Sequence, residues 1–221
     1  MIFKKRLKLT SVISFILCMM PCMAFANPAP RECPEWTGNI NALIGFIVLD
    51  QSDWGHESTN GETGIMFDIK KKDWPVSIAG DFLYSEGHRF FFSHVNGYWS
   101  KPGFGHVYVP EGNYGEVILK TFEIDLGTRK IWENHPVFRP FAGGGISYID
   151  TRGELTWSTG TSINKGTGTG AWVGTGTYFR FSTHLNVALE YRFSYIEVKM
   201  TSGDSVIAGG HHVRFILGYN W

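Results

Sequence analysis

Serine and histidine are the first candidates for chemistry, because a serine nucleophile needs a histidine base within hydrogen-bond reach. Ser182 and His184 have the two-residue spacing that puts both side chains on one face of an extended chain. They lie, however, in the polar stretch Ser182-Thr183-His184 between two apolar segments, which indicates a short turn. We therefore predict no catalytic site in this chain.

Histidine also binds metals, and the segment 87–114 contains His88, His94 and His106 among many aromatic residues. Their gaps of six and twelve residues match no known ligand spacing, so we predict no metal site and no cofactor. The segment is expected to form an extended hairpin whose aromatic side chains pack against one another. Exposed aromatics could instead form a patch for lipopolysaccharide or a host surface.

The N-terminus has the pattern of a secretory signal peptide. Lys4, Lys5, Arg6 and Lys8 precede the apolar run Leu9 to Phe25, and Ala24-Phe25-Ala26 ends it with the small residues that a signal peptidase reads. A membrane anchor is the alternative, but the run is short and is followed by Asn27-Pro28. We predict that residues 1–26 are cleaved and that residues 27–38 form a short N-terminal segment.

Removal of this signal changes the composition. The full chain has 20 basic and 20 acidic residues, and the signal takes four basic and no acidic ones, which leaves a net charge of −4. A mature chain that is not basic argues against nucleic acid as a partner. Cys18 and Cys22 leave with the signal, so Cys33 remains alone and no intramolecular disulfide is possible. All 27 glycines stay, so the share of glycine in the mature chain is about twice the usual one of roughly 7%.

The mature chain alternates between apolar and polar residues with a period of two, which predicts β-strands. The longest uninterrupted apolar run is Ala42 to Leu49, far below the about 20 residues of a spanning helix. Two segments have an ambiguous phase: 41–49 is apolar on both faces, and 138–149 contains three consecutive glycines. Eight strands are predicted, near residues 39–50, 62–70, 75–86, 115–131, 137–150, 170–181, 185–199 and 210–221.

The connections alternate between short turns and longer polar loops. The short ones are 71–73, 133–136 and 182–184, and the long ones lie near 51–61, 87–114, 151–169 and 200–209. This is the organisation of outer-membrane barrels, with the short turns in the periplasm. Aromatic residues near strand ends fit girdles at the two interfaces: Trp54, Trp74, Tyr84, Trp132, Tyr148, Tyr195, Tyr219 and Trp221. We predict an all-β protein of the cell outer membrane, with residues 39–221 in a closed antiparallel up-and-down barrel; a soluble secreted β-sandwich is the alternative.

Two stretches resemble a known family. The ending Val213-x-Phe215-x-Leu217-x-Tyr219-x-Trp221 resembles the C-terminal signature of outer-membrane β-barrels, which implies that Phe215, Leu217, Tyr219 and Trp221 are an assembly signal read by the barrel-assembly machinery. The stretch Arg139 to Tyr148, with Gly143-Gly144-Gly145, resembles a strand of eight-stranded barrels like the transmembrane domain of outer-membrane protein A. Lipid A deacylases of this architecture carry an H-x-S-N arrangement on a strand. This sequence has no H-x-S, which counts against such an enzyme.

The polar face of the strands carries charges of both signs. An eight-stranded barrel is just wide enough inside for side chains to fill it, so we predict a static plug made by a lumen charge network. Because buried charges are costly unless they are paired, Glu123 or Asp125 is expected to meet Arg180 or Arg129. His212 should face the lumen near Glu190 or Arg192, as a polar rim residue or as part of a pH-sensitive plug. The predicted network consists of Asp81, Glu123, Asp125, Arg129, Arg180, Glu190, Arg192 and Arg214.

The function that these patterns favour is a structural or surface-interaction role through four extracellular loops, without an enzymatic site. The alternatives are a small pore or carrier for apolar or small solutes, and a lipid A-modifying enzyme. Outer-membrane lipids and lipopolysaccharide are the expected partners, with the barrel-assembly machinery during biogenesis. The sequence itself names no surface ligand.

Overall fold

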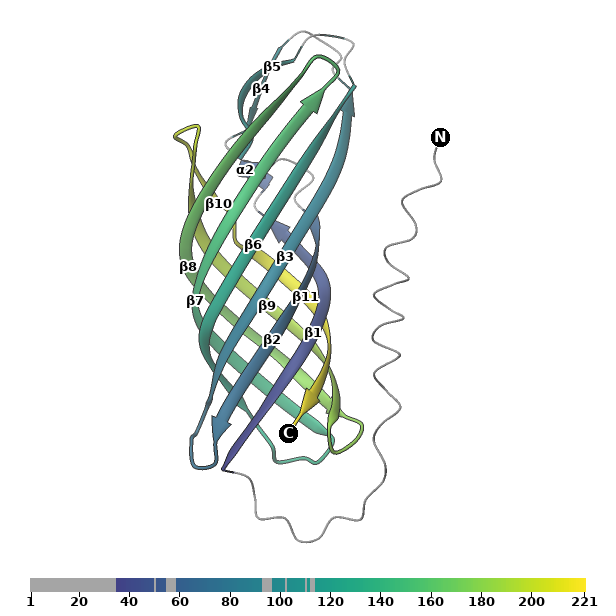
Figure 1. Ribbon diagram of the computed structural model, residues 1–221, viewed down its shortest axis with the longest axis vertical. Helices are drawn as coiled ribbons and strands as arrows, with labels where there is room; N and C mark the ends of the chain where they lie inside the picture. Colours follow the sequence, from purple (N-terminus) through teal and green to yellow (C-terminus); the bar gives the residue numbers. More distant parts are fainter. Residues whose placement is uncertain are drawn as a thin grey trace. The chain divides into compact units, whose positions relative to one another are not determined.

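Eight long strands pair in a closed ring, each antiparallel to its neighbours (Figure 1). The computed structural model describes residues 35–49, 51–54, 59–92, 97–101, 103–109, 111 and 114–221. The predicted signal peptide, Cys33 and His94 lie outside them. The ring strands are β1 (Trp36–Leu49), β2 (Thr59–Lys71), β3 (Ser77–Phe92), β6 (Tyr114–Ile131), β7 (Phe138–Trp157), β8 (Gly160–Arg180), β9 (Leu185–Met200) and β11 (Gly210–Asn220). The connections contain α2 (Gln51–Trp54), β4 (Gly97–Lys101), β5 (Gly105–Val109) and β10 (Ser205–Ile207). The predicted closed up-and-down barrel is confirmed.

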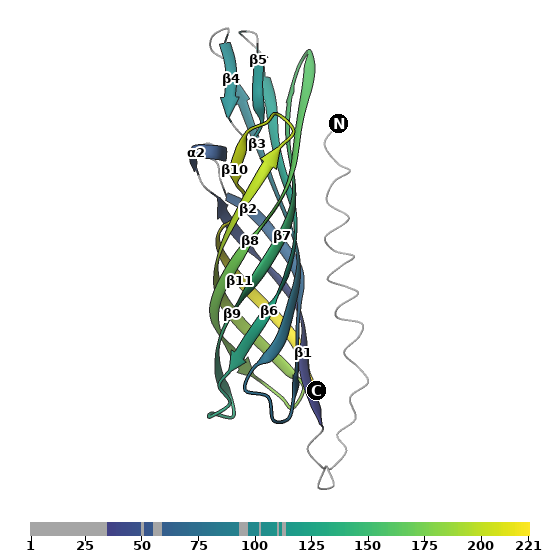
Figure 2. The same ribbon diagram turned by 90° about the vertical axis from the view of Figure 1, so that its left-hand side faces the viewer.

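The closed ring has a definite stagger. Following cross-strand partners from Tyr84 through β6 leads to Asp150 on β7. Following them the other way, through β2, β1, β11, β9 and β8, leads to Pro140 on the same strand, ten residues lower. Such a stagger tilts the strands against the barrel axis, as Figure 2 shows. An interior of this size is filled by side chains.

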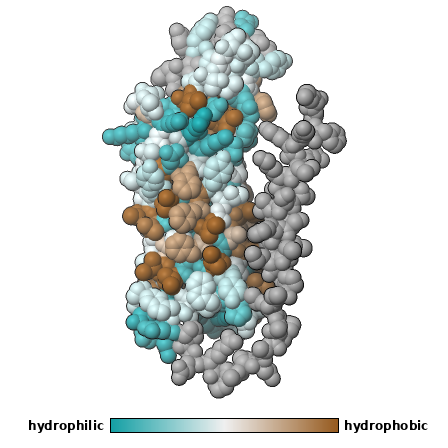
Figure 3. All heavy atoms as spheres, viewed as in Figure 1, coloured by the Kyte–Doolittle hydropathy of each residue, from teal (hydrophilic) through white to brown (hydrophobic). Residues whose placement is uncertain are grey.

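Successive residues point alternately into the barrel and out of it. In β9, buried residues alternate with exposed ones from Asn186 to Met200. The outward positions are large and apolar at mid-height, and Figure 3 shows them as a brown band around the visible face. This belt includes Ile40, Ile44, Ile65, Ile78, Phe82, Leu126, Ile146, Val173, Leu189, Phe215 and Leu217, each 39% to 67% exposed. In water such a continuous apolar surface would be costly, whereas in hydrocarbon it is not.

Aromatic side chains border the belt at both ends. At the end with the short turns lie Trp36, Trp74, Trp132, Phe181 and Trp221, all exposed. At the other end, an outward tyrosine stands at the edge of the belt on each of three strands: Tyr84 of β3, Tyr148 of β7 and Tyr195 of β9. The next outward residue on each of these strands is acidic: Glu86, Asp150 and Glu197. These positions mark the two interfaces of the belt.

Several strands continue beyond the belt and are longer than predicted. β7 reaches Trp157 and β8 starts at Gly160, so most of the loop expected at 151–169 is strand. β3 likewise extends to Phe92, and the segment 97–109 contributes the hairpin of β4 and β5. The prediction of a loop at 151–169 was wrong, because the outward positions there are mostly polar and lack the apolar face of a lipid-facing strand. The extension of β3 and β6 agrees with the extended hairpin predicted for 87–114. Within the part of the chain that is described, no helix has the length and apolar character to cross a bilayer.

The three consecutive glycines allow β6 and β7 to approach closely. Gly145 lies directly opposite Gly127. A Cβ atom built on Gly145 would stand 2.0 Å from the carbonyl oxygen of Leu126 and 2.6 Å from the Cα of Gly127. Both obstacles are backbone, so a side chain could be accommodated only if the strands separated.

Candidate functional site

The inward charges of five strands converge at mid-height in the lumen. Their side chains are buried, because inward positions at this level face one another across the narrow barrel. The group comprises Glu62 and Asp68 of β2, Asp81 of β3, Asp125 and Arg129 of β6, Glu190 and Arg192 of β9, and His212 and Arg214 of β11, with Glu123 of β6 beside them. We call this set the lumen charge network.

Arg192 lies at the centre of the lumen charge network. Its guanidinium donates to Asp81 and Asp125 in short ion pairs, and its Nη2 lies 3.4 Å from the Glu190 carboxylate. The Trp172 ring packs under the same guanidinium, 4.0 Å from its carbon to the ring centroid. Three carboxylates and an aromatic face thus surround one buried cation, which offsets its desolvation.

Arg129 of β6 links the network to β2 and β3. Its Nη1 lies 3.4 Å from Asp68 and its Nη2 lies 3.5 Å from Asp81. The Phe141 ring centroid is 5.5 Å from its guanidinium carbon. Asp81 therefore bridges two arginines, Arg129 and Arg192.

A third group closes the network between β2 and β11. Glu62 accepts a short hydrogen bond from Arg214 Nε, and its other oxygen lies 2.7 Å from His212 Nδ1. The opposite ring nitrogen of His212 lies 2.9 Å from Ser194 Oγ. Arg214 also lies 3.4 Å from Glu190, which connects this group to Arg192. Every strand of the barrel except β1, β7 and β8 supplies a charge, and Ser147 of β7 donates to Asp125.

The structure brings together seven of the eight residues predicted for this network. The exception is Arg180, which lies at the periplasmic end and donates to the carbonyl oxygens of Ser182 and Thr183. The expected pairs are also wrong: Asp125 meets Arg192, while Glu123 makes no ion pair among the described residues and its Oε1 has no hydrogen-bond partner there. Register decides these pairs, and one strand's alternation does not reveal the register.

Two acidic residues complete the network without having been in the predicted set. Glu62 and Asp68 are inward residues of β2, in phase with Met66. The period of two was the signal that could have found them, since positions 62, 66 and 68 share one face. His212 faces the lumen as predicted and lies opposite Arg192 in the ladder, but its hydrogen bonds go to Glu62 and Ser194.

Above the network, the lumen is apolar rather than polar. A cluster of buried side chains fills this level: Ile47, Leu49, Trp54, Phe104, Leu119, Ile149, Ile196, Val198, Met200, Val206 and Ala208. Trp54 of α2 donates to the carbonyl of Ile207 at 2.8 Å and packs edge-on against Phe104, 5.7 Å between centroids. Trp54 was predicted to lie in an interfacial girdle; it is instead 5% exposed inside this cap, because α2 turns inward over the mouth.

The interior is thus closed at two levels, by ion pairs at mid-height and by the apolar cap above. Outside, the belt is apolar and bordered by aromatic residues. A closed barrel leaves no sheet edge unpaired, and an apolar exterior around a charged interior suits only a lipid environment. The chain is an outer-membrane β-barrel. Among the described residues, no group of three or more His, Cys, Asp or Glu side chains is placed so that it could hold a metal ion.

No protein-family model and no curated protein sequence matches this barrel. Among solved structures it is similar to a major outer membrane protein from Thermus thermophilus, with 10% identity, a TM-score of 0.48, and coverage of 84% of this chain and 99% of that chain. The N-terminal β-barrel domain of Pseudomonas aeruginosa OprF gives 11% identity, a TM-score of 0.46, and coverage of 84% and 97%. Ail of Yersinia pestis, in complex with the heparin analogue sucrose octasulfate, gives 13% identity, a TM-score of 0.45, and coverage of 84% of this chain and 97% of that chain.

Proposed function

We propose that this outer-membrane barrel is a static scaffold with a structural or surface-interaction role, without enzymatic activity or a conducting lumen. The observation that carries the proposal is the filled interior. Arg129, Arg192 and Arg214 are each at most 1% exposed, and Trp172 lies against Arg192. Opening a path would require breaking several buried ion pairs at once, which is costly because each leaves an uncompensated charge.

The interaction surface is the part of the barrel that stands above the belt. The ladder between β2 and β3 ends at Glu86, and the ladder between β8 and β9 ends at Gly166. Beyond these points, β3, β6, β7 and β8 continue as a four-stranded sheet, and the β4–β5 hairpin accompanies it (Figure 2). We call these strand ends and the hairpin the extracellular extension.

The extracellular extension presents large aromatic side chains to solvent. Phe90 is 80% exposed and Tyr114 is 76% exposed, and both lie on the outward face. Because they stand on paired strands, their backbone is already ordered, which lowers the entropy lost when a partner binds. Aromatic residues are also those that interfaces favour.

The proposal includes outer-membrane lipids and lipopolysaccharide as partners. Lys120, Arg152 and Lys165 are direct cross-strand neighbours on the outward face, just above the belt. Like charges placed opposite one another are destabilising. Glu86 lies 3.2 Å from Lys120 and Glu154 lies 3.1 Å from Arg152, whereas Lys165 takes part in no ion pair within the described residues. Anionic headgroups at this level would offset its charge.

A shortened extension tests this role. Arg152 and Lys165 are cross-strand partners, so residues 153–164 can be replaced by an Asn-Gly turn that keeps the ladder below them. The variant should still shift between unboiled and boiled gels as a folded barrel does, and should fail to restore the surface or envelope phenotype of a deletion strain. Full restoration by a folded, shortened barrel would refute a role for the extension.

A further inference from the structure

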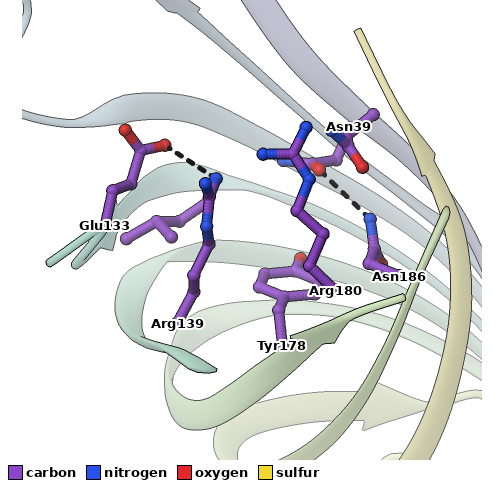
Figure 4. A pocket seen from close by; sticks show the side chains of 8 residues that line it. Asn39, Glu133, Arg139, Tyr178, Arg180 and Asn186 are labelled. Carbon is purple, nitrogen blue, oxygen red and sulfur yellow. Dashed lines mark hydrogen bonds and ion pairs between the residues drawn. The ribbon is translucent and has the colours of Figure 1, made fainter. Parts of the chain in front are cut away.

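A cavity opens at the periplasmic end of the lumen, on the side away from the apolar cap. Figure 4 shows the side chains that line it. Its walls come from the ends of β1, β6, β7, β8, β9 and β11 and from the turn that follows β6. The lining residues are Asn39, Ile131, Glu133, Arg139, Tyr178, Arg180, Asn186 and Asn220. We call this cavity the periplasmic notch.

Positive charge dominates the periplasmic notch. Arg139 and Arg180 both line it, and Glu133 is the single acidic residue among the lining side chains. The pair between Glu133 and Arg139 is loose: the atoms are 3.5 Å apart and the Glu133 side chain is 54% exposed. Burial and the neighbouring charge of Arg139 lower the pKa of Arg180. Two guanidinium groups therefore line one cavity, with one weakly held carboxylate beside Arg139.

Several buried polar atoms of the notch have no hydrogen-bond partner among the described residues. They are the Tyr178 hydroxyl, Arg139 Nε, and the side-chain oxygens of Asn186 and Asn220. Tyr178 is only 3% exposed, and its ring lies 4.7 Å from that of Phe141, which fixes the position of the hydroxyl. A buried polar group left unpaired is costly, so both donors and acceptors here are set for a ligand or for water.

We propose that the periplasmic notch binds the C-terminal carboxylate of a peptide chain. A guanidinium group matches a carboxylate in charge and in the spacing of its donors, and Arg139 already forms an ion pair with the carboxylate of Glu133. The terminal residue of a peptide also carries an amide N–H next to its carboxylate. That N–H is the donor which the unpaired oxygens of Asn186 and Asn220 lack. The proposal is independent of the role of the extracellular extension.

Titration of the folded barrel in detergent micelles with N-acetyl-Ala-Ala, followed by NMR shifts of the tyrosine and arginine side chains, tests the site. The free acid should shift Tyr178 saturably, and the same peptide with an amidated C-terminus should not. Arg139→Gln should weaken binding on the order of tenfold, because a charge-assisted hydrogen bond is lost. Glu133→Gln should strengthen binding, because it removes the competing carboxylate.

Arg152→Gln is the matched control, since Arg152 is outward and pairs with Glu154 on the extracellular side. It should leave the peptide affinity unchanged, and all variants should keep the gel shift of a folded barrel. Three results would overturn the proposal: no saturable shift, equal binding of acid and amide, or equal binding of inorganic phosphate. The last would mark a general anion site. If Arg139→Gln unfolds the barrel, the proposal is tested instead by Glu133→Gln, which should increase the affinity for the peptide.

Discussion

Replacing Arg192 by methionine should destabilise the barrel severely. Methionine keeps most of the volume and removes the charge. Asp81 would retain Arg129, and Glu190 would retain Arg214, each at 3.4 to 3.5 Å. Asp125 would retain the hydrogen bond from the Ser147 hydroxyl, which carries no charge. The change therefore leaves at least one buried carboxylate without a cation.

Breaking a buried ion pair by removing one partner costs about 3–5 kcal/mol. The loss here should fall in that range, since the two remaining arginines compensate for part of the charge. The free energy of unfolding can be measured by urea titration of the barrel in lipid vesicles, with tryptophan fluorescence as the probe. Adding Asp125→Asn to Arg192→Met should recover part of the loss, because the unpaired charge disappears.

Arg152→Met provides the control, because Arg152 also forms an ion pair, 3.1 Å from Glu154, but lies on the outward face. An exposed pair of this kind contributes about 0–1 kcal/mol. If Arg192→Met costs less than about 1 kcal/mol, or no more than Arg152→Met, the lumen charge network does not stabilise the barrel. Failure of Asp125→Asn to recover any stability would refute the assignment of the unpaired carboxylate.

Three further perturbations have defined outcomes. Gly145→Ala should cost about 1–3 kcal/mol in the same urea titration, because its Cβ would meet backbone 2.0 Å away, whereas Gly61→Ala, whose nearest neighbour is at 3.8 Å, should be nearly neutral; equal costs would contradict the close approach. Hydrogen bonds to two carboxylates raise the pKa of His88. The stability that His88 contributes at the top of β3 is therefore complete below the ordinary pKa near 6.5 and is lost as the pH rises through the raised value. An NMR titration showing an unshifted pKa of His88 would refute this contribution. Trp221→Ala should lower the amount of folded barrel in outer-membrane fractions on unboiled gels if the C-terminal residue is read by the assembly machinery, while Trp132→Ala, a girdle residue at the same end, should not.

The closed barrel could be predicted from sequence because each strand carries its own evidence. Leu189 and Glu190 are adjacent, yet one faces lipid and the other lies in the lumen, and a period of two assigns both. The same rule explains why His212 and Arg214 were expected on one face. Whether a side chain points to the lipid or into the lumen depends only on its position along its own strand, so the neighbouring strands need not be known.

The ion pairs could not be predicted, because they depend on how the strands are staggered. Asp125 and Arg192 lie 67 residues apart and on strands that are not neighbours in the ring. Only the accumulated register of the whole barrel brings them to one level. Arg180 was misplaced for a related reason: it has the polar phase of β8, but its height puts it beside the periplasmic turn, where backbone carbonyls are available.

The apolar cap was missed because its residues come from connections and from strand ends that leave the lipid. Trp54 and Phe104 lie in different connections, and nothing in their local sequence indicates that they meet. Where β7 rises above the belt, apolar residues face inward and polar residues face outward, as with Leu155 and Glu154. This reverses the pattern at mid-height, so alternation alone cannot reveal which face is inside.

Electrical recording from the purified protein in a planar bilayer tests the closed lumen most directly. Folding of the same preparation in proteoliposomes is verified separately by the gel shift. We predict no stepwise conductance above that of the bare membrane, because ion pairs around Arg192 and the apolar cap block the lumen at two levels. Reproducible conductance steps from inserted wild-type protein would contradict this account.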